Sequence, residues 1–531
     1  MPMTPPPPPA YLILTGADLW TGEALRAGQA VVVKGPRILA VGDPEKLAKA
    51  HPKATVVTLR GGTLLPGLIE GHAHVAGVGR LKRTVDLVGC QDLPEALGRI
   101  RTWAEAHAGG WVVGRGWDQN RWPGKAFPTA RDLDRLTGTR PAFLQRVDGH
   151  AAWVNGAALA LAGIDAKTPD PAGGRILRDE TGAPTGILVD NAVELVAKLM
   201  PAPTFEEAEA TLLEGLRALR AEGFTAVCDM GIGPQDLAAY RHLASTGTLP
   251  IRVFAYLSHE PALMLRELKA PRPKAAAWFQ VQGVKFYLDG ALGSRGARLL
   301  APYADAPETS GLWVTDPATV ARDAAITLRS GYQPAIHAIG DAANRAALDL
   351  LEAARKKAHN AVLPRIEHAQ IVTAEDAARF GALGVVASVQ PVHCTSDHAW
   401  TPTRLGPERT SEAFPWRRFL EGGAMLAFGS DAPVEEANPF VSLAAAQTRQ
   451  DPDGDPPGGF LPDQRLTPEE ALMAYTAWNA KALGRAELGA IKAGAVADLL
   501  WVEAALPTSD AAALRKVRPG RLWVNGVEVT P

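Results

Sequence analysis

Two histidines with metal-ligand spacing, His72 and His74, follow an apolar run of strand length at residues 64–69. Residues two apart on a β-strand point to the same face, so both imidazoles could bind one metal ion. His-x-His pairs also occur where no metal binds, and so short a motif needs support from its context. The metal interpretation therefore depends on further ligands at the ends of later strands.

Further residues of ligand type lie at the ends of later strand-like segments. They are Lys285, His337, His368 and Asp431. Each has an ordinary explanation on its own, because a strand-end lysine can reach solvent, a histidine can pack in a core and an aspartate can cap a turn. As a set, imidazoles and a carboxylate suit zinc, and other divalent ions less selectively.

The elements that would position these residues alternate along the middle of the chain. Strands are predicted at 63–69, 224–229, 251–257, 281–288, 332–336, 365–368, 385–389 and 425–428. Helical patterns separate many of them, for example at 206–222 and 317–329. This alternation favours an α/β fold with parallel strands, and about eight strands fit a (β/α)8 TIM barrel. Functional residues of such barrels lie at the carboxyl ends of the strands.

The predicted barrel domain covers residues 63–487 and carries an inserted subdomain at about 110–200, a stretch rich in Trp, Gly and Pro. Both ends of the chain have a different pattern. Short strands separated by glycine turns are predicted at 11–60, and a hairpin turn is predicted at Asn525-Gly526. We therefore expect a small composite β-sandwich domain built from residues 1–62 and 488–531.

Composition and charge exclude several classes of partner. The chain has 531 residues and a formal net charge of −2, so no strong field favours nucleic acid or an anionic membrane. Its three cysteines, Cys90, Cys228 and Cys394, do not suggest a disulfide framework. The proline-rich start lacks the features of a signal peptide, and no apolar stretch approaches the length of a membrane span. We expect a cytoplasmic protein.

Taken together, the sequence resembles the amidohydrolase superfamily of metal-dependent hydrolases, and more closely its YtcJ-like branch, which includes N-substituted formamide deformylases. The resemblance covers nearly the whole chain. Its motifs, beside the ligand set itself, are PGLIEGHAH at 66–74, GWDQN at 116–120, DGHAAW at 148–153, DGALGSR at 289–295 and SVQP at 388–391.

The resemblance implies a centre of one or two divalent ions, with zinc as the expected metal. It assigns His72, His74 and Asp431 to the more buried ion, and His337 and His368 to the second. A small molecule is the implied substrate, and the resemblance also allows a homodimer.

Lys285 would bridge the two ions as an N-carboxylated lysine, a carbamate derived from CO2. A free ammonium group beside two cations would be repelled, whereas the carbamate is an anion. Zinc lowers the pKa of bound water from near 16 to about 7, which gives a nucleophile at neutral pH. The implied reaction is hydrolysis of a C–N bond in an amide, formamide or cyclic amide by metal-activated hydroxide. Asp431 would act as the proton shuttle.

Residues outside the ligand set are candidates for substrate binding. Three lie in the predicted insertion and could cover the site, although tryptophan there serves packing equally well. The full candidate set is Asp118, Trp122, His150, Asp289, Arg295 and Gln390.

Two other functions compete with C–N hydrolysis of an amide. A mononuclear deaminase of the same superfamily would act on an aminated heterocycle, but such enzymes generally lack the lysine and have His-x-x-Glu on the fifth strand. Here Lys285 is present, and Ala-Ile-Gly-Asp follows His337. A non-catalytic scaffold would lack ligands, and none of the expected ligands is missing from the sequence.

Overall fold

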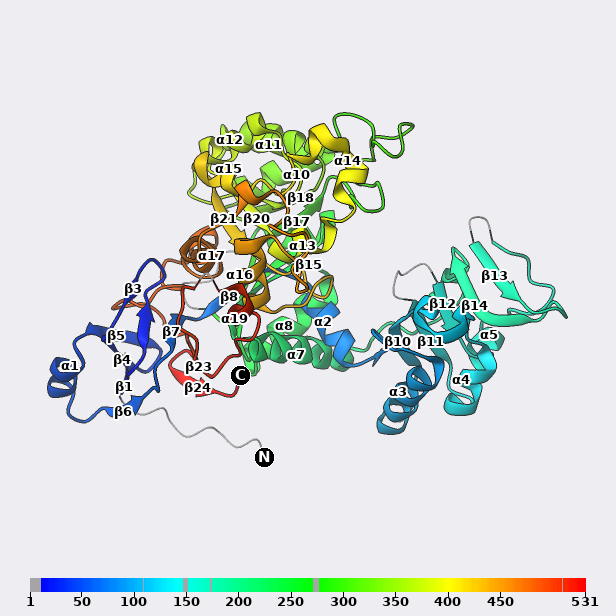
Figure 1. Cartoon of the computed structure of the whole chain (residues 1–531), viewed down its shortest axis with the longest axis horizontal. Coiled ribbons are helices and arrows are strands. Elements are labelled where there is room, and N and C mark those ends of the chain that lie inside the picture. The colour runs from blue at the N-terminus through cyan, green and yellow to red at the C-terminus, as the bar shows by residue number, and fades with distance from the viewer. Residues whose placement is uncertain (1–10, 108, 147–150, 172–173, 271–276, 509) are drawn as a thin grey trace. The chain divides into compact units, whose positions relative to one another are not determined.

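The computed structural model describes residues 11–107, 109–146, 151–171, 174–270, 277–508 and 510–531. The chain divides into two compact units (Figure 1). One consists of residues 1–75 and 216–531, and the other of residues 76–215. No helix in the described ranges is both long enough and apolar enough to cross a membrane.

The larger unit contains an eight-stranded parallel sheet that curves into a nearly closed barrel. Its strands, in sheet order, are β21 (Met425–Phe428), β20 (Val386–Val389), β19 (Arg365–His368), β18 (Gln333–Ala338), β17 (Phe279–Tyr287), β16 (Arg252–Leu257), β15 (Phe224–Ile232) and β8 (Leu68–Ala73). A bridge between Ala73 and Ala432 joins the two edge strands. Across this seam the Asp431 amide donates to the His72 carbonyl at 2.7 Å. The predicted barrel is confirmed.

Helices connect successive barrel strands. They are α7 (Phe205–Ala221), α8 (Pro234–Thr246), α9 (Pro261–Glu267), α10 (Pro317–Arg329), α11 (Asp341–Arg355), α12 (Ala374–Leu383), α13 (Pro391–Asp397), α14 (Thr401–Thr410) and α15 (Trp416–Glu421). The last barrel strand, β21, is followed by α16 (Pro439–Thr448), a short 3₁₀ turn η3 (Pro462–Gln464), α17 (Pro468–Tyr475) and α18 (Ala477–Ala482). Local sequence sets their ends. The Asp316 side chain caps α10 by accepting from the Thr319 amide, and Gly247 ends α8 in the left-handed conformation.

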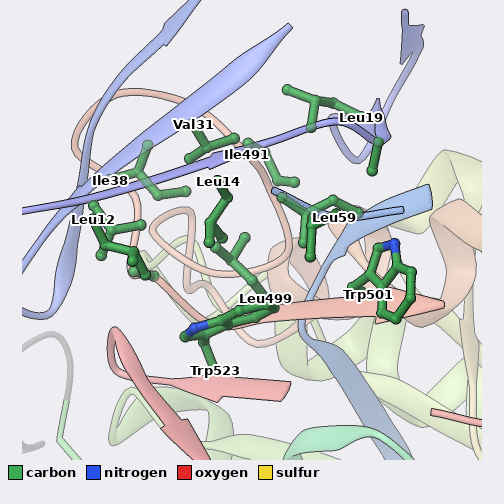
Figure 2. Packing of buried hydrophobic residues seen from close by; sticks show 14 of the residues in the cluster. Leu12, Leu14, Leu19, Val31, Ile38, Leu59, Ile491, Leu499, Trp501 and Trp523 are labelled. Carbon is green, nitrogen blue, oxygen red and sulfur yellow. The ribbon is translucent and has the colours of Figure 1, made fainter. Parts of the chain in front are cut away.

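Both chain termini contribute to two further sheets. Their strands are β1 (Leu12–Thr15), β2 (Asp18–Trp20), β3 (Leu25–Arg26), β4 (Ala30–Lys34), β5 (Arg37–Gly42), β6 (Thr55–Thr58), β7 (Thr63–Pro66), β22 (Leu499–Val502), β23 (Arg521–Val524) and β24 (Val527–Val529), and the helices beside them are α1 (Pro44–Ala50) and α19 (Ala511–Leu514). One sheet has the order β5-β4-β1-β6 and the other β24-β23-β22-β7-β2-β3. Figure 2 shows their shared core, in which Leu14 and Val31 cluster with Leu499 and Trp523.

The prediction of one strand at 63–69 was wrong. The structure divides this run at Gly67. The segment before it, β7, pairs with β22 of the terminal sheet, whereas the segment after it, β8, pairs with β15 of the barrel. Only glycine fits here, because an added Cβ would lie 2.2 Å from the Thr225 hydroxyl oxygen and 2.9 Å from the Asp498 Cβ. The continuous apolar run hid this change of sheet.

The second unit has a six-stranded mixed sheet of its own. Its elements are α2 (Val75–Lys82), β9 (Val85–Asp86), α3 (Leu93–Ala106), β10 (Val112–Trp117), η1 (Gln119–Arg121), η2 (Pro123–Lys125), α4 (Ala130–Thr137), β11 (Ala142–Arg146), β12 (Ala151–Val154), α5 (Gly156–Leu161), β13 (Gly174–Arg178), β14 (Pro184–Asp190) and α6 (Glu194–Ala197). Its sheet order is β13-β14-β12-β11-β10-β9. Trp117, Trp122 and Trp153 pack in one of its cores. The stretch rich in Trp, Gly and Pro at about 110–200 therefore lies within a regular folded unit.

Candidate metal centre

All six predicted metal ligands come together at the carboxyl ends of barrel strands. His72 lies near the end of β8 and His74 directly follows it, Lys285 lies near the end of β17, His337 near the end of β18, His368 ends β19, and Asp431 follows β21. His72 Nε2 and His74 Nε2 lie 3.4 and 3.2 Å from Asp431 Oδ1. Lys285 Nζ lies 3.4 Å from His72 Nε2.

Hydrogen bonds orient the imidazoles toward this centre. His72 Nδ1 lies 2.6 Å from a carboxylate oxygen of Glu367, and His74 Nδ1 lies 2.9 Å from the carbonyl oxygen of Met230. A carbonyl oxygen and an ionised carboxylate can only accept hydrogen bonds. Each Nδ1 therefore carries the hydrogen, and each Nε2 keeps its lone pair. His368 Nδ1 likewise contacts the side-chain oxygen of Gln390 at 2.9 Å. Metal-binding histidines are commonly held in this way.

Several buried polar atoms at the centre have no hydrogen-bond partner among the described residues. They are His337 Nε2, His393 Nε2 and Asp431 Oδ1. Buried polar groups are almost always satisfied, so a cluster of unsatisfied donors and acceptors indicates a ligand site. Imidazole nitrogens around a carboxylate oxygen fit a divalent cation of the zinc type.

Among the described residues, two sets of three ligand atoms lie close enough together to hold an ion. One is His72, His74 and Asp431, and the other is His368, His393 and Asp431. Within each set the atoms lie within 4.8 Å of one another. Asp431 is shared, so the geometry permits two neighbouring cation positions.

His393 also lies in the centre, although the predicted ligand set does not include it. It lies in α13, three residues beyond Gln390, and its Nε2 is 3.9 Å from Asp431 Oδ2. Its ring stacks at 5.9 Å on that of His368. His337 belongs to neither set, although its ring centroid lies 4.5 Å from that of His368. The signal that could have found His393 is its position directly after the seventh barrel strand.

Burial favours the uncharged form of three histidines at the centre, His72, His337 and His368. It lowers the pKa of His72 to about 4 and that of His337 to about 3, and in both cases the charge of Lys285 adds to the effect. Burial also places the pKa of His368 well below its usual range. Neutral imidazole is the metal-binding form, so these histidines can bind a cation at neutral pH without first losing a proton.

Asp431 and Lys285 respond differently to the same surroundings. Burial opposes ionisation of Asp431, but the neighbouring imidazoles, led by His72, reverse this and hold its pKa well below the usual range. Burial lowers the pKa of Lys285 to about 8. In the described part of the chain, no carboxylate lies within ion-pair distance of Lys285 Nζ. A substantial fraction of this lysine is therefore a neutral amine near pH 8.

Unusual backbone conformations turn two of the ligands inward. His368 has φ 71° and Asp431 has φ 59°, both in the left-handed region that residues other than glycine rarely adopt. Such strain is concentrated at functional sites. The buried side chain of Glu70 supports the junction between β8 and β21. Its Oε1 accepts hydrogen bonds from the backbone amides of His72 at 2.9 Å and Ser430 at 2.8 Å.

The candidate substrate residues of the barrel have structural contacts. Both carboxylate oxygens of Asp289 accept backbone hydrogen bonds, from Ile339 at 3.0 Å and from Gly340 at 2.8 Å. Arg295 pairs with Asp305 at 2.8 Å. Gln390 orients His368. A role of these residues in substrate binding remains a prediction.

The candidates of the smaller unit were Asp118, Trp122 and His150. Asp118 forms an ion pair with Arg146 at 2.9 Å. Trp122 is buried and donates its indole hydrogen to the Cys90 carbonyl at 3.1 Å, so packing explains its position. His150 lies outside the described residues. A covering role for this unit remains a prediction.

Comparison with known proteins decides the family. A family model described as "Amidohydrolase family" matches residues 55–530. The chain belongs to the amidohydrolase family. A putative amidohydrolase, YtcJ of Bacillus subtilis, is 31% identical over 463 residues, which is 85% of this chain and 86% of that protein. The predicted YtcJ-like relationship is thereby confirmed.

Two further relatives agree with this assignment. An N-substituted formamide deformylase of Arthrobacter pascens is 28% identical over 540 residues, with 97% of each chain covered. The crystal structure of an uncharacterized metal-dependent hydrolase from Pyrococcus furiosus superimposes with a TM-score of 0.77 at 30% identity, covering 92% of this chain and 97% of that one. The protein is thus a hydrolase of the amidohydrolase family.

Proposed function

We propose that this amidohydrolase hydrolyses a C–N bond in an amide, formamide or cyclic amide of a small molecule. The observation that supports it most is the convergence of His72, His74 and Asp431, with Nδ1 of both imidazoles engaged elsewhere and Nε2 directed toward the carboxylate. The Arthrobacter relative, named as an N-substituted formamide deformylase, supports this substrate class.

The residues His72, His74 and Asp431 would hold one divalent ion, with zinc as the expected metal. His337, His368 and His393 offer nitrogens for a second ion. A divalent ion bound there lowers the pKa of a water molecule and polarises a carbonyl group. The protein itself contributes neutral imidazoles, whose protonation does not compete with the ion at neutral pH.

Asp431 is the proposed proton carrier. Its low pKa keeps it ionised at neutral pH, so it can accept a proton as water attacks the carbonyl carbon. It then donates that proton to the nitrogen as the C–N bond breaks, which releases the amine. Its shared position between both sets of histidines supports this role.

Lys285 is proposed to be carboxylated. CO2 reacts with a neutral amine, and burial lowers the pKa of Lys285 to about 8, which increases the neutral fraction. The carbamate would bridge two ions as an anionic oxygen ligand. We also propose that the enzyme works in the cytoplasm, on the basis of its three free, buried cysteine thiols.

The runner-up is a mononuclear deaminase acting on an aminated heterocycle. Lys285 in the centre argues against it, because a single-ion site needs no bridging anion. The two proposals differ in the metal content and in the released product.

The first experiment measures metal per chain by plasma mass spectrometry, on protein purified without chelator or metal-affinity tag. We expect about two zinc-like ions per chain. Formamides, amides and cyclic amides are then screened beside aminated heterocycles. Amine release from the first group supports the proposal, whereas one ion per chain and ammonia release from the heterocycles would establish the deaminase. No ion after reconstitution with metal and bicarbonate would refute both.

A further inference from the structure

A fully buried carboxylate behind the metal centre contacts one of the proposed ligands. Glu367 Oε2 lies 2.6 Å from His72 Nδ1, and neither side chain has any solvent exposure. Glu367 immediately precedes His368 on β19. Because side chains alternate along a strand, Glu367 points to the opposite side of β19 from His368. Its carboxylate there contacts the imidazole of His72 on β8.

Arg365, two residues earlier on the same face of β19, fixes that carboxylate in place. Its Nε and Nη2 donate to the two oxygens of Glu367 at 2.5 and 3.0 Å. Its Nη2 also donates to the Gly71 carbonyl at 2.7 Å and to the Ser388 hydroxyl at 2.6 Å. The guanidinium thus joins β19 to β8 and β20.

A buried ion pair of this kind is weak evidence for stability. Apolar side chains of similar volume often stabilise a protein as well or better, because desolvation of both charges is costly. Barrel interiors are usually filled by branched apolar residues. Retaining two charges directly behind His72 is therefore better explained by what the pair does to that imidazole.

The contacts of His72 define its tautomer. The ionised carboxylate can only accept, so Nδ1 must carry the hydrogen. On the other side of the ring, Lys285 Nζ lies 3.4 Å from Nε2, as expected for a donor facing a lone pair. The lone pair of Nε2 thus points to the side where Lys285 and Asp431 lie.

We propose that Glu367 is a positioning residue, which fixes His72 as the Nδ1–H tautomer and thereby sets the cation affinity of the centre, with Arg365 holding the Glu367 side chain in place through both of its oxygens. This inference rests on the proposed metal centre. Partners of this type typically contribute 10- to 100-fold to metal affinity.

Glu367→Gln is the informative change because it keeps the side-chain volume. Both carboxylate oxygens accept from Arg365, so an amide group at either position places N–H donors against the guanidinium. When the amide oxygen occupies the position of Oε1, it still accepts from Arg365 Nε, and the amide nitrogen takes the position of Oε2 beside His72 Nδ1. An N–H donor at that position favours the opposite tautomer of His72, with the hydrogen on Nε2. A hydrogen on Nε2 blocks cation binding by that nitrogen.

The test compares Zn²⁺ binding by chelator-stripped wild-type protein, E367Q and a matched control, D323N, in competition with a chromophoric chelator. Asp323 also contacts a histidine, His259, at 2.8 Å, but neither residue belongs to the centre. We expect E367Q to bind Zn²⁺ about 10- to 100-fold more weakly than wild type. D323N should stay within about twofold of wild type, and circular dichroism checks that all three proteins are folded.

Equal Zn²⁺ affinity of E367Q and wild type would overturn the inference, as would an equal loss in D323N. Wild-type protein that binds no Zn²⁺ would instead refute the proposed centre itself. If E367Q does not fold, ¹⁵N-histidine spectra of the wild-type apoprotein decide, with His72 assigned by its loss in H72N. An Nδ1–H tautomer supports the inference, and an Nε2–H tautomer overturns it.

Discussion

Asp431→Asn tests whether Asp431 moves protons or serves only as a ligand. Asparagine has nearly the same shape and is one of the few residues that accepts the left-handed backbone seen here at φ 59°. The substitution therefore removes the charge and the proton-accepting oxygen but leaves the seam between β8 and β21 in place. An alanine or valine at this position would confound the result with backbone strain.

The magnitude follows from the contacts of Asp431. Its Oδ1 lies 3.2 and 3.4 Å from two imidazole nitrogens, and its Oδ2 lies 3.9 Å from His393 Nε2, so no other carboxylate of the two ligand sets can replace it. A positioned general acid–base typically contributes 10²- to 10⁴-fold in rate. This corresponds to about 3 to 5 kcal/mol in activation free energy.

The assay measures kcat on the best substrate of the screen together with metal per chain for the same preparation. We expect kcat to fall by at least about 100-fold in D431N with half or more of the metal retained. A variant that keeps full metal and more than a tenth of the wild-type kcat would refute the proton-transfer role. A loss of kcat in strict proportion to lost metal would show that Asp431 is a ligand alone.

Three further perturbations test other parts of the structure. Metal analysis of His393→Ala tests whether His393 is a ligand of the second cation position, and we expect one fewer ion per chain. Unchanged metal content with a reduced kcat would show that His393 is not a ligand there. For the metal-stripped protein, the free energy of unfolding of wild type relative to H72N, and relative to H337N, should fall as the pH falls from about 6.5 to 5, because the unfolded wild-type chain then protonates the histidine while the folded chain, with pKa values of about 4 and 3, does not. The expected change in each urea-denaturation difference is about 2 kcal/mol, and a difference that does not vary with pH would contradict it. Gly67→Ala should lower the unfolding free energy by about 1 to 3 kcal/mol, since its Cβ would lie 2.2 Å from the Thr225 hydroxyl oxygen; an unchanged thermal midpoint would contradict that close approach.

The barrel was predictable because each of its strands and helices has a recognisable pattern of apolar residues within its own segment of the sequence. Helix α10 begins at Pro317 and ends at Arg329, as its proline start and following glycine predicted. The strand ends were predictable for the same reason, and placing ligands there required only the rule that parallel strands share one functional edge. The structure brings those six residues together.

Features that depend on contacts between distant segments were not predictable. The break at Gly67 results from pairing of β7 with β22, more than 400 residues later. The hydrogen-bond partner of His74 is the backbone carbonyl of Met230, and residue types do not reveal which backbone carbonyl will accept a hydrogen bond. Hydrogen-bond partners of this kind emerge only from the folded chain.

Charge balance links Lys285 to cation binding. At the centre, Arg365 and Glu367 cancel, and the carboxylate of Asp431 balances the ammonium form of Lys285. Burial raises the pKa of Glu70 to about 8 and that of Asp289, whose Oδ1 lies 3.7 Å from His337 Nε2, to about 7, so these two carboxyl groups are ionised only in part at neutral pH. A divalent ion entering beside the ammonium form would leave uncompensated positive charge in a buried site, a costly arrangement. Carboxylation replaces one positive with one negative charge and so reduces that excess. Cation uptake and carboxylation of Lys285 are therefore expected to favour each other, so bicarbonate should strengthen Zn²⁺ binding by wild-type protein and have no effect on K285M.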